Sequence, residues 1–274
     1  MKDINLTIAG GCFTEQHNIA YDKLYHQTVK HYIENIYGSK LNINIIRYER
    51  FSTFPAKLKK LLDNNVTEVL LFHVRSEQFL RLSKLYYKYS DDKGKIKYSL
   101  NFPAFKINNP EKHDIPVQIP QSFYRYSSED LFSIKKSLSR KIFSELNYIA
   151  GILSGNSYVA LKEYMELIHN VSDYCREKNI QFILAGPASR PNTLLENYLT
   201  DNLHNISSNY AVRNKIHFIS CLGKFSENGE YLFFKNGIHV NEAGHRRIAE
   251  KIIIKLIEIF SPEETQTLSL IKNK

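Results

Sequence analysis

Hydrophobic positions along the chain alternate between short apolar stretches and longer stretches with helical spacing. The apolar stretches are rich in β-branched and aromatic residues, which predicts strands at residues 4–10, 41–48, 67–74, 180–186 and 215–220. Helical patterns between them predict helices over residues 20–37, 54–64, 76–90 and 193–212. This alternation is typical of βαβ units, so we expect a parallel sheet covered by helices.

The alternation is interrupted between residues 91 and 120. This stretch has little periodicity and contains Pro103, Pro110, Pro116 and Pro120, which predicts an inserted loop or lid. Residues 121–178 are helical in pattern and predict two helices. The second has an apolar face that we expect in the core, formed by Leu161, Tyr164, Met165, Ile168 and Val171.

The last apolar stretch predicts a long final helix, with Ile248, Ile252, Leu256 and Phe260 at helical spacing. Asn241 stands where an N-cap residue is expected, so His239 falls in the loop just before this helix. We therefore expect one domain over residues 1–274, with an insertion at about 91–150 and a C-terminal tail at 262–274.

Composition narrows the class of protein. At 274 residues and 43% hydrophobic content the chain is large enough for a sizeable core. Asp3 and Asn5 interrupt the first apolar stretch, which favours a strand over a signal peptide. The longest apolar stretches are too short or too charged to cross a bilayer. We expect a soluble, cytoplasmic protein with no membrane span.

Cysteine and charge content bear on cofactors and partners. Three cysteines match neither a disulfide framework nor a zinc site, so we expect free thiols, no metal and no cofactor. The net charge of +9 is spread without a dense basic run, which favours a solvated surface over a nucleic-acid site. Attraction to an anionic substrate or an acidic acyl carrier protein stays open.

The stretch GGCFTE follows the first predicted strand. Ligands of open parallel sheets bind beyond the carboxyl ends of the strands, so this turn faces the expected site. Gly10 and Gly11 permit a sharp turn, and the amide of Cys12 would donate toward the same space. Cys12 is either a nucleophile or a small residue that closes a turn, and this stretch alone does not decide between them.

The stretch NGIHVNEAGH, near the other end, places Asn236 three residues before His239. Together the two stretches resemble the first and last motifs of the SGNH/GDSL hydrolase family. Cys12 stands at the position of the family's nucleophilic Ser, His239 at its histidine, and Asn236 at its Asp. The resemblance implies a three-layer αβα fold with a flavodoxin-like, five-stranded parallel sheet and an inserted segment.

The middle motifs depart from the family pattern. In place of the expected Gly after the second strand the chain offers Ser52, and in place of the Asn after the third it has His73 and Arg75. Arg75 could stabilise an oxyanion or bind a carboxylate or phosphate of the substrate. The alternatives are that Arg75 forms a surface ion pair and that His73 is a hydrogen-bonded histidine of the core. Arg190 and Asn192 are candidates to line the pocket; the alternative is that they have a structural role in their loop.

The two departures from the family pattern in the first and last motifs, Cys12 for Ser and Asn236 for Asp, are chemically consistent with each other. A thiol beside a histidine ionises readily, so a neutral Asn suffices to orient the imidazole, as in Cys-His-Asn proteases. We expect a hydrolase, an esterase or thioesterase that forms a thioester acyl-enzyme on a small acyl substrate. Two alternatives stay open: an acyltransferase to an amine or alcohol, and a non-catalytic binding domain with this fold.

Overall fold

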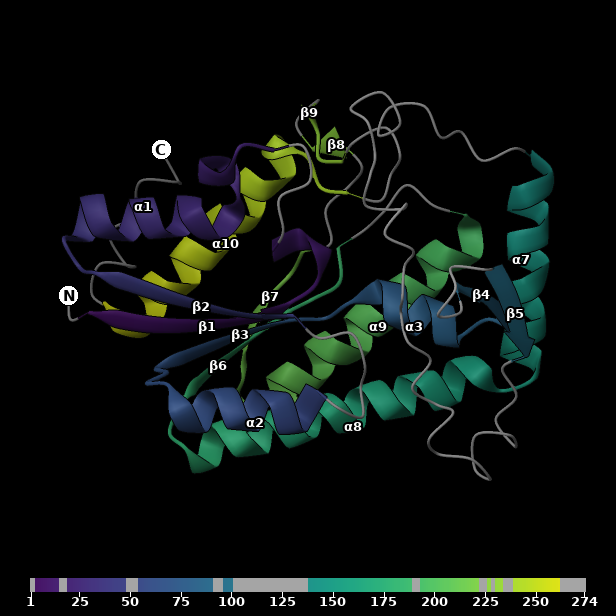
Figure 1. Cartoon of the computed structure of the whole chain (residues 1–274), viewed down its shortest axis with the longest axis horizontal. Coiled ribbons are helices and arrows are strands. Elements are labelled where there is room, and N and C mark those ends of the chain that lie inside the picture. Colours follow the sequence, from purple (N-terminus) through teal and green to yellow (C-terminus); the bar gives the residue numbers. More distant parts are fainter. Residues whose placement is uncertain are drawn as a thin grey trace.

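Five parallel strands form the central sheet, in the order β2-β1-β3-β6-β7 (Figure 1). In the computed structural model, residues 3–14, 19–47, 54–90, 96–100, 138–188, 193–221, 226–227, 230–233 and 239–261 are described. The strands are β1 (Ile4–Gly10), β2 (Leu41–Arg47), β3 (Val69–His73), β6 (Gln181–Ala185) and β7 (His217–Ile219). The predicted sheet is thereby confirmed, with its five strands at the predicted places.

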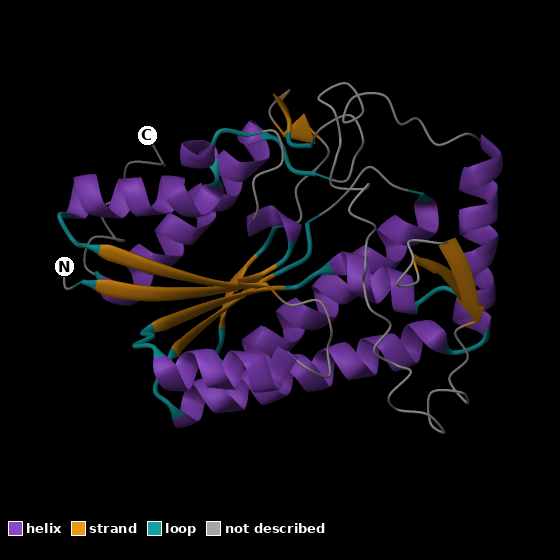
Figure 2. Cartoon of the chain, viewed as in Figure 1, coloured by secondary structure: helices purple, strands orange, loops and turns teal. Residues whose placement is uncertain are grey.

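Helices cover both faces of the sheet, which gives three layers (Figure 2). One face carries α1 (Tyr25–Tyr37) and α10 (Glu242–Phe260), which pack on each other. The other carries α2 (Phe54–Asn64), α8 (Asn156–Glu177) and α9 (Leu194–Arg213). The expected α/β class and three-layer arrangement are therefore confirmed.

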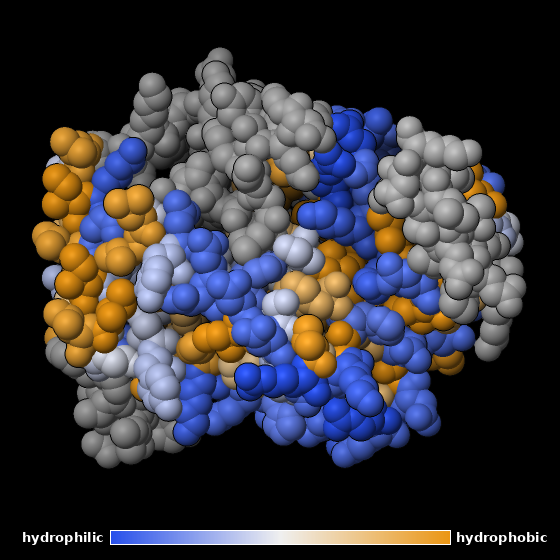
Figure 3. Space-filling model, turned by 180° about the vertical axis from the view of Figure 1, so that it is seen from behind, coloured by the Kyte–Doolittle hydropathy of each residue, from blue (hydrophilic) through white to orange (hydrophobic). Residues whose placement is uncertain are grey.

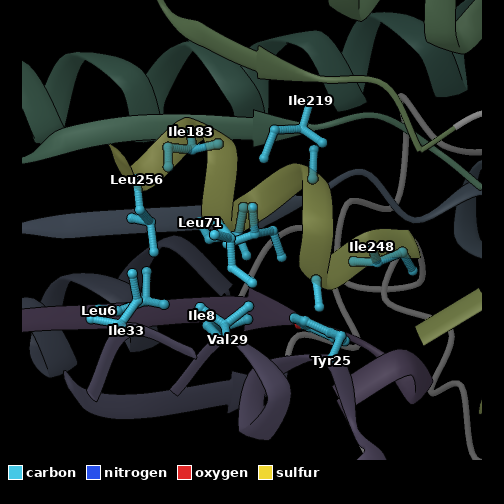
Figure 4. Close-up of a cluster of buried hydrophobic side chains, with 14 of the residues drawn as sticks. Leu6, Ile8, Tyr25, Val29, Ile33, Leu71, Ile183, Ile219, Ile248 and Leu256 are labelled. Carbon is cyan, nitrogen blue, oxygen red and sulfur yellow. The ribbon is translucent and has the colours of Figure 1, made fainter. Parts of the chain in front are cut away.

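Strand β3 shows how the sequence builds two cores. Val69 and Leu71 point into the cluster formed with α1 and α10, whereas Leu70 and Phe72 point into the cluster beneath α2, α8 and α9. Successive side chains of a strand face opposite sides, so a continuous apolar strand fits a sheet that is buried on both faces. Figure 4 shows the first cluster, in which Leu71 lies between Leu6 and Ile8 of β1 and Ile183 of β6.

The predicted core faces of the long helices are also confirmed. On α8, Tyr164, Ile168 and Val171 are buried, and Leu161 and Met165 pack against the same cluster. On α10, Ile248, Ile252 and Leu256 are buried, and Phe260 packs at the edge of its cluster. Asn241 caps α10, because its Oδ1 accepts from the N–H of Gly244 at 2.9 Å.

The single helix predicted over residues 76–90 is wrong. Helix α3 (Ser76–Leu82) ends early, and β4 (Tyr86–Ser90) pairs antiparallel with β5 (Ile96–Leu100). Asn147 fixes the start of β4, with its side chain accepting from the N–H of Tyr86 and donating to its carbonyl. Strand pairing and this amide outweigh the weak helical pattern of the Tyr-rich segment.

Helix α7 (Leu138–Leu153) lies at the edge of the molecule, against α8 and α9. Its inner face holds Gly151, where an added Cβ would lie 2.0 Å from the carbonyl oxygen of Ser83. Its outer face is apolar and is the hydrophobic area at the left edge of Figure 3. The exposed side chains are Leu138, Ile142, Phe143, Leu146, Ile149, Ile152 and Leu153.

Much of the predicted insertion and the predicted C-terminal tail at 262–274 lie outside the described residues. Of the insertion at about 91–150, the structure describes β5 and the part from Leu138 onward, which begins α7. Two further short strands, β8 (Ser226–Glu227) and β9 (Glu230–Tyr231), form a hairpin before α10. Among the described helices, none has the length and apolar character needed to cross a membrane.

Candidate active site

The carboxyl ends of β1 and β3 mark the point where the chain changes faces. From β1 the chain passes through η1 (Cys12–Thr14) and η2 (Tyr21–Lys23) to α1 on one face. From β3 it passes to α3, which packs on α8 and α9 on the other side. In a sheet of this order, such a switch point leaves a crevice where ligands bind. The turn that carries Cys12 directly follows β1 at this switch point.

Gly11 and Arg75 meet at the switch point. A Cβ built on Gly11 would lie 2.2 Å from Nε and 2.6 Å from Cζ of Arg75, so only glycine leaves room for the guanidinium. Arg75 is 6% exposed, and its side chain pairs with Glu77 across 3.9 Å. Arg75 thus has an ion pair, as the alternative held, but it is buried against the residue that precedes Cys12 and does not lie on the surface.

The turn after β1 is closed by its own threonine. Both the backbone N–H and the hydroxyl of Thr14 donate to the carbonyl of Gly11, at 3.0 and 2.7 Å. A Cβ on Gly10 would lie 2.6 Å from Cγ2 of Thr14, so close packing requires glycine at position 10 as well. The backbone of Cys12 is thereby held in a single turn of 3₁₀ helix.

His73, at the end of β3, is 4% exposed and lies beneath this turn. Its Nε2 is 2.8 Å from the hydroxyl oxygen of Tyr25. Burial lowers the pKa of His73 to about 4 and raises the pKa of Tyr25 well above its usual value. Both groups are therefore neutral at pH 7, and His73 has the hydrogen-bonded core environment that the sequence offered as an alternative.

Tyr25 also joins this turn to the last helix. Its backbone N–H donates to Nδ1 of His245 at 3.2 Å, and the two rings stack at 15° with centroids 5.9 Å apart. His245 lies in the first turn of α10, and half-buried His239 lies just before that helix. A chain of contacts thus runs from Gly10 through His73, Tyr25 and His245 to the segment that carries His239.

The sequence-based prediction did not include Tyr25 and His245 in this site. Neither stands in a recognisable motif, and Tyr25 looks like an ordinary helix residue. The one available signal was helical spacing, because His245 precedes Ile248 and Ile252 on the apolar face of the final helix. A histidine on an apolar face indicates a buried hydrogen-bonding partner, although the pattern does not name it.

The candidate residues divide into two groups. Gly11, His73, Arg75 and His239 lie in the described part of the chain. The others lie outside the described residues: Ser52, Arg190, Asn192 and Asn236, together with the side chain of Cys12. Within the described ranges, no three His, Cys, Asp or Glu side chains gather in a way that could hold a metal ion.

Comparison with family profiles and curated proteins gives no match, whereas solved structures do match the fold. The acetylxylan esterase Axe2 from Geobacillus stearothermophilus aligns with a TM-score of 0.53 at 10% identity, covering 91% of this chain and 92% of its own. TesA aligns with a TM-score of 0.52 at 9% identity, covering 90% and 95%. The lipase/acylhydrolase from Enterococcus faecalis gives 0.51 at 8% identity, covering 93% and 95%.

These likenesses extend over nearly the whole of each chain, and at such low identity they establish the fold alone. The chain therefore shares its three-layer α/β fold with these three proteins, which fits the fold expected from the resemblance of its first and last motifs. The activity of this protein has to be argued from its own residues.

Proposed function

We propose that this protein is a cysteine-dependent acyl hydrolase, an esterase or thioesterase. The observation that carries the proposal is the contact between Gly11 and Arg75, which sets a buried cation beside the turn of Cys12 at the switch point of the sheet. Among proteins of this fold, Axe2 is an acetylxylan esterase and the Enterococcus faecalis protein a lipase/acylhydrolase, which supports acyl chemistry at this position.

In the proposed reaction, the sulfur of Cys12 attacks an acyl carbonyl carbon and forms a carbon–sulfur bond. His239 accepts the thiol proton and gives it to the departing alcohol or thiol, and Asn236 orients the imidazole. Water, deprotonated by His239, then attacks the thioester. The acid leaves, and the proton returns to the sulfur of Cys12.

Arg75 has two uses in this scheme. A fixed positive charge in a buried environment stabilises the oxyanion of the tetrahedral intermediate, together with the amide of Cys12. The same charge, next to Gly11, lowers the free energy of a thiolate at Cys12 relative to the thiol. An arginine in this position therefore supplies the donor that the family's Gly and Asn do not supply here.

The other two thiols are suitable controls. Burial raises the pKa of both Cys175 and Cys221 to about 12, so neither is a thiolate at neutral pH. Cys175 is buried in the apolar cluster beneath α8, and Cys221 packs at the edge of the cluster beneath α10, near Lys251. We expect acylation at Cys12 alone.

Acyl transfer is the second candidate function. Amines attack thioesters readily, and the net charge of +9 suits an acidic acyl carrier protein as donor. The two candidates share the acyl-enzyme and differ in the group that accepts the acyl chain. A non-catalytic binding domain, the third possibility, would form no acyl-enzyme at all.

The test is incubation with activated acyl esters and thioesters, with and without amine acceptors, followed by intact-protein mass spectrometry. We expect a single acyl adduct on the wild type and on Cys175→Ala, and none on Cys12→Ala. Free acid as product identifies a hydrolase, and acyl-amine a transferase. The covalent mechanism is wrong if Cys12→Ala turns over as fast as the wild type, and His239→Ala acylating at the wild-type rate would remove His239 from its role.

A further inference from the structure

The outer face of α7 is apolar and exposed along the helix (Figure 3). Its seven exposed apolar side chains range from Ile152, at 37% exposed, to Leu153, at 82%. Their exposed fractions amount to about four complete side chains of Leu, Ile or Phe size, on the order of 700 Å² of apolar surface. The largest apolar patch of a typical monomer is about 300–600 Å², so this face is larger than a free surface usually carries.

The helix is anchored so that this face cannot turn inward. On the opposite side of α7, the hydroxyl of Tyr148 donates to Oε1 of Glu196 at 2.9 Å, and the side chain of Asn147 bonds to the backbone at the start of β4. Gly151 packs so closely on the carbonyl oxygen of Ser83 that a Cβ would not fit. Rotation of α7 would break all three contacts, so burial of the outer face requires a partner.

The outer face has the spacing of a surface that pairs with another helix. Four of its side chains follow one another at separations of four, three and four residues: Ile142, Leu146, Ile149 and Leu153. This is the spacing of the core positions in two helices that wrap around each other. Because the separations are the same when they are counted in either direction, the four residues form a seam that is complementary to its own copy in an antiparallel pair.

The charge on this face favours the antiparallel pair. Lys141 is exposed near the N-terminal end of α7. In a parallel pair it would lie beside the same cation of the other copy. In an antiparallel pair it lies beside the C-terminal turn of the other α7, whose last carbonyl groups carry partial negative charge. This arrangement places Ile142 against the partner's Leu153. At the centre of the seam, Leu146 then packs against the partner's Ile149.

We propose that the protein forms a two-fold symmetric dimer through the outer faces of two antiparallel α7 helices. The exposed apolar surface of about 700 Å² on each chain is close to the roughly 800 Å² that each partner contributes to a standard protein–protein interface. The dimer goes beyond the proposed function, since none of the residues of this face belongs to the proposed catalytic group.

Sedimentation equilibrium over a wide range of protein concentration tests the dimer. We expect twice the mass of the chain, with a dissociation constant in the micromolar range or below. Leu146→Glu puts a charge at the centre of the seam in both copies and should weaken the dimer at least about hundredfold, as should Ile149→Glu. The matched control is Ile36→Glu, since Ile36 is an equally exposed apolar residue on α1, across the sheet, and this variant should dimerise like the wild type. Circular dichroism checks that every variant keeps its helical content.

The orientation of the helices is tested by cross-linking in Cys12→Ala protein, which lacks the proposed reactive thiol. A mixture of Ile142→Cys and Leu153→Cys proteins should form cross-linked dimers with a short bismaleimide. The Ile142→Cys protein alone should not, because in an antiparallel pair the two copies of position 142 lie about 16 Å apart along the axis at 1.5 Å per residue. Equal cross-linking of the single variant and of the mixture overturns the antiparallel arrangement.

Three other results would overturn the dimer. The first is a wild type that stays monomeric at every concentration. The second is an equal loss of dimer in Ile36→Glu, which would mean that the seam is not special. The third is a monomer that co-sediments with vesicles of phosphatidylcholine and phosphatidylglycerol and loses this binding in Leu146→Glu, since the face would then bind lipid. The acylation assay is separate: a dimer that forms no acyl adduct refutes the proposed function and leaves this interface in place.

Discussion

Tyr25 and His73 form a buried hydrogen bond of 2.8 Å that joins the first helix to the end of the central strand β3. Tyr25 is fully buried and His73 nearly so, directly beneath the glycines of the Cys12 turn. Burial keeps both groups neutral, so this hydrogen bond packs against the Cys12 turn without adding a charge to the site. The other neighbour of the turn, Arg75, supplies the positive charge that the proposed mechanism uses.

Replacement of Tyr25 by Phe tests this bond. The ring and its stacking on His245 remain, whereas the buried imidazole of His73 loses its hydrogen bond to the Tyr25 hydroxyl. We expect the free energy of unfolding to fall by about 1–3 kcal/mol, measured by urea denaturation. Tyr32→Phe, on the half-buried part of the same helix, is the control and should cost much less. An equal loss in both variants would contradict a special role for the Tyr25 hydroxyl.

The low pKa of His73 predicts a pH dependence of stability. In the unfolded chain a histidine binds a proton near pH 6.5, whereas in the folded protein His73 does so only near pH 4. The unfolded state therefore takes up the extra proton between these values, so stability is full above pH 6.5 and falls as the pH drops toward 4. The contribution of His73 is about 3 kcal/mol at most.

The measurement is the free energy of unfolding of the wild type and of His73→Gln at pH 7.5, 6.5, 5.5 and 4.5. His26, His204 and His217 also have pKa values lowered by burial, so the wild-type curve alone mixes several residues. The difference between the two proteins isolates His73. It should shrink steadily toward pH 4.5, and a constant difference would show that His73 is not the group responsible.

Local patterns were sufficient to predict the sheet and the long helices. Apolar stretches of strand length and amphipathic stretches such as Ile248 to Phe260 depend only on neighbouring residues, so one sequence reveals them. Segment 86–90 was predicted wrongly because its structure depends on pairing with β5 and on Asn147, about sixty positions away. Strand propensity depends on such partners more than helix propensity does.

The candidate site was predictable only in part, for the same reason. Motifs indicated Cys12 and His239, and the place of Arg75 after the third strand indicated that residue, but the contacts around them join residues far apart in the chain. Tyr25 is 48 positions from His73 and 220 from His245. The pairing of Gly11 with Arg75 also depends on the order of β1 and β3 in the sheet, and no local pattern contains that contact.

Gly11→Ala tests the contact with Arg75. The added methyl group would overlap the guanidinium, so the arginine or the Cys12 turn has to move. We expect a loss of about 1–3 kcal/mol of stability and, if the proposed chemistry is right, at least about tenfold slower acylation of Cys12. Urea denaturation and the mass-spectrometric acylation assay measure the two effects.

A double-mutant cycle with Arg75→Ala shows whether the cost arises from this contact. Removal of the guanidinium leaves space for the methyl group, so Gly11→Ala should destabilise the Arg75→Ala protein much less than the wild type. Additive effects within about 0.5 kcal/mol would mean that Gly11 is needed for a reason other than Arg75. The acylation rate should stay low in the double variant, because Arg75 is also the proposed oxyanion donor.

The cap of α10 gives a last prediction, which links helix stability to the position of His239. Asn241→Ala removes the acceptor of the Gly244 N–H and should lower stability by about 1 kcal/mol. Asn241→Asp retains this acceptor, loses only the long bond of 3.4 Å that the Asn241 amide donates to the carbonyl of Phe233, and should cost less than Asn241→Ala. Thr193→Ala, before α9, is the control because that residue makes no side-chain cap bond. Since His239 is two residues before the cap, Asn241→Ala should also slow acylation of Cys12 while Asn241→Asp keeps it. Slower acylation in Thr193→Ala as well would mean that general stability, rather than the cap, sets the rate.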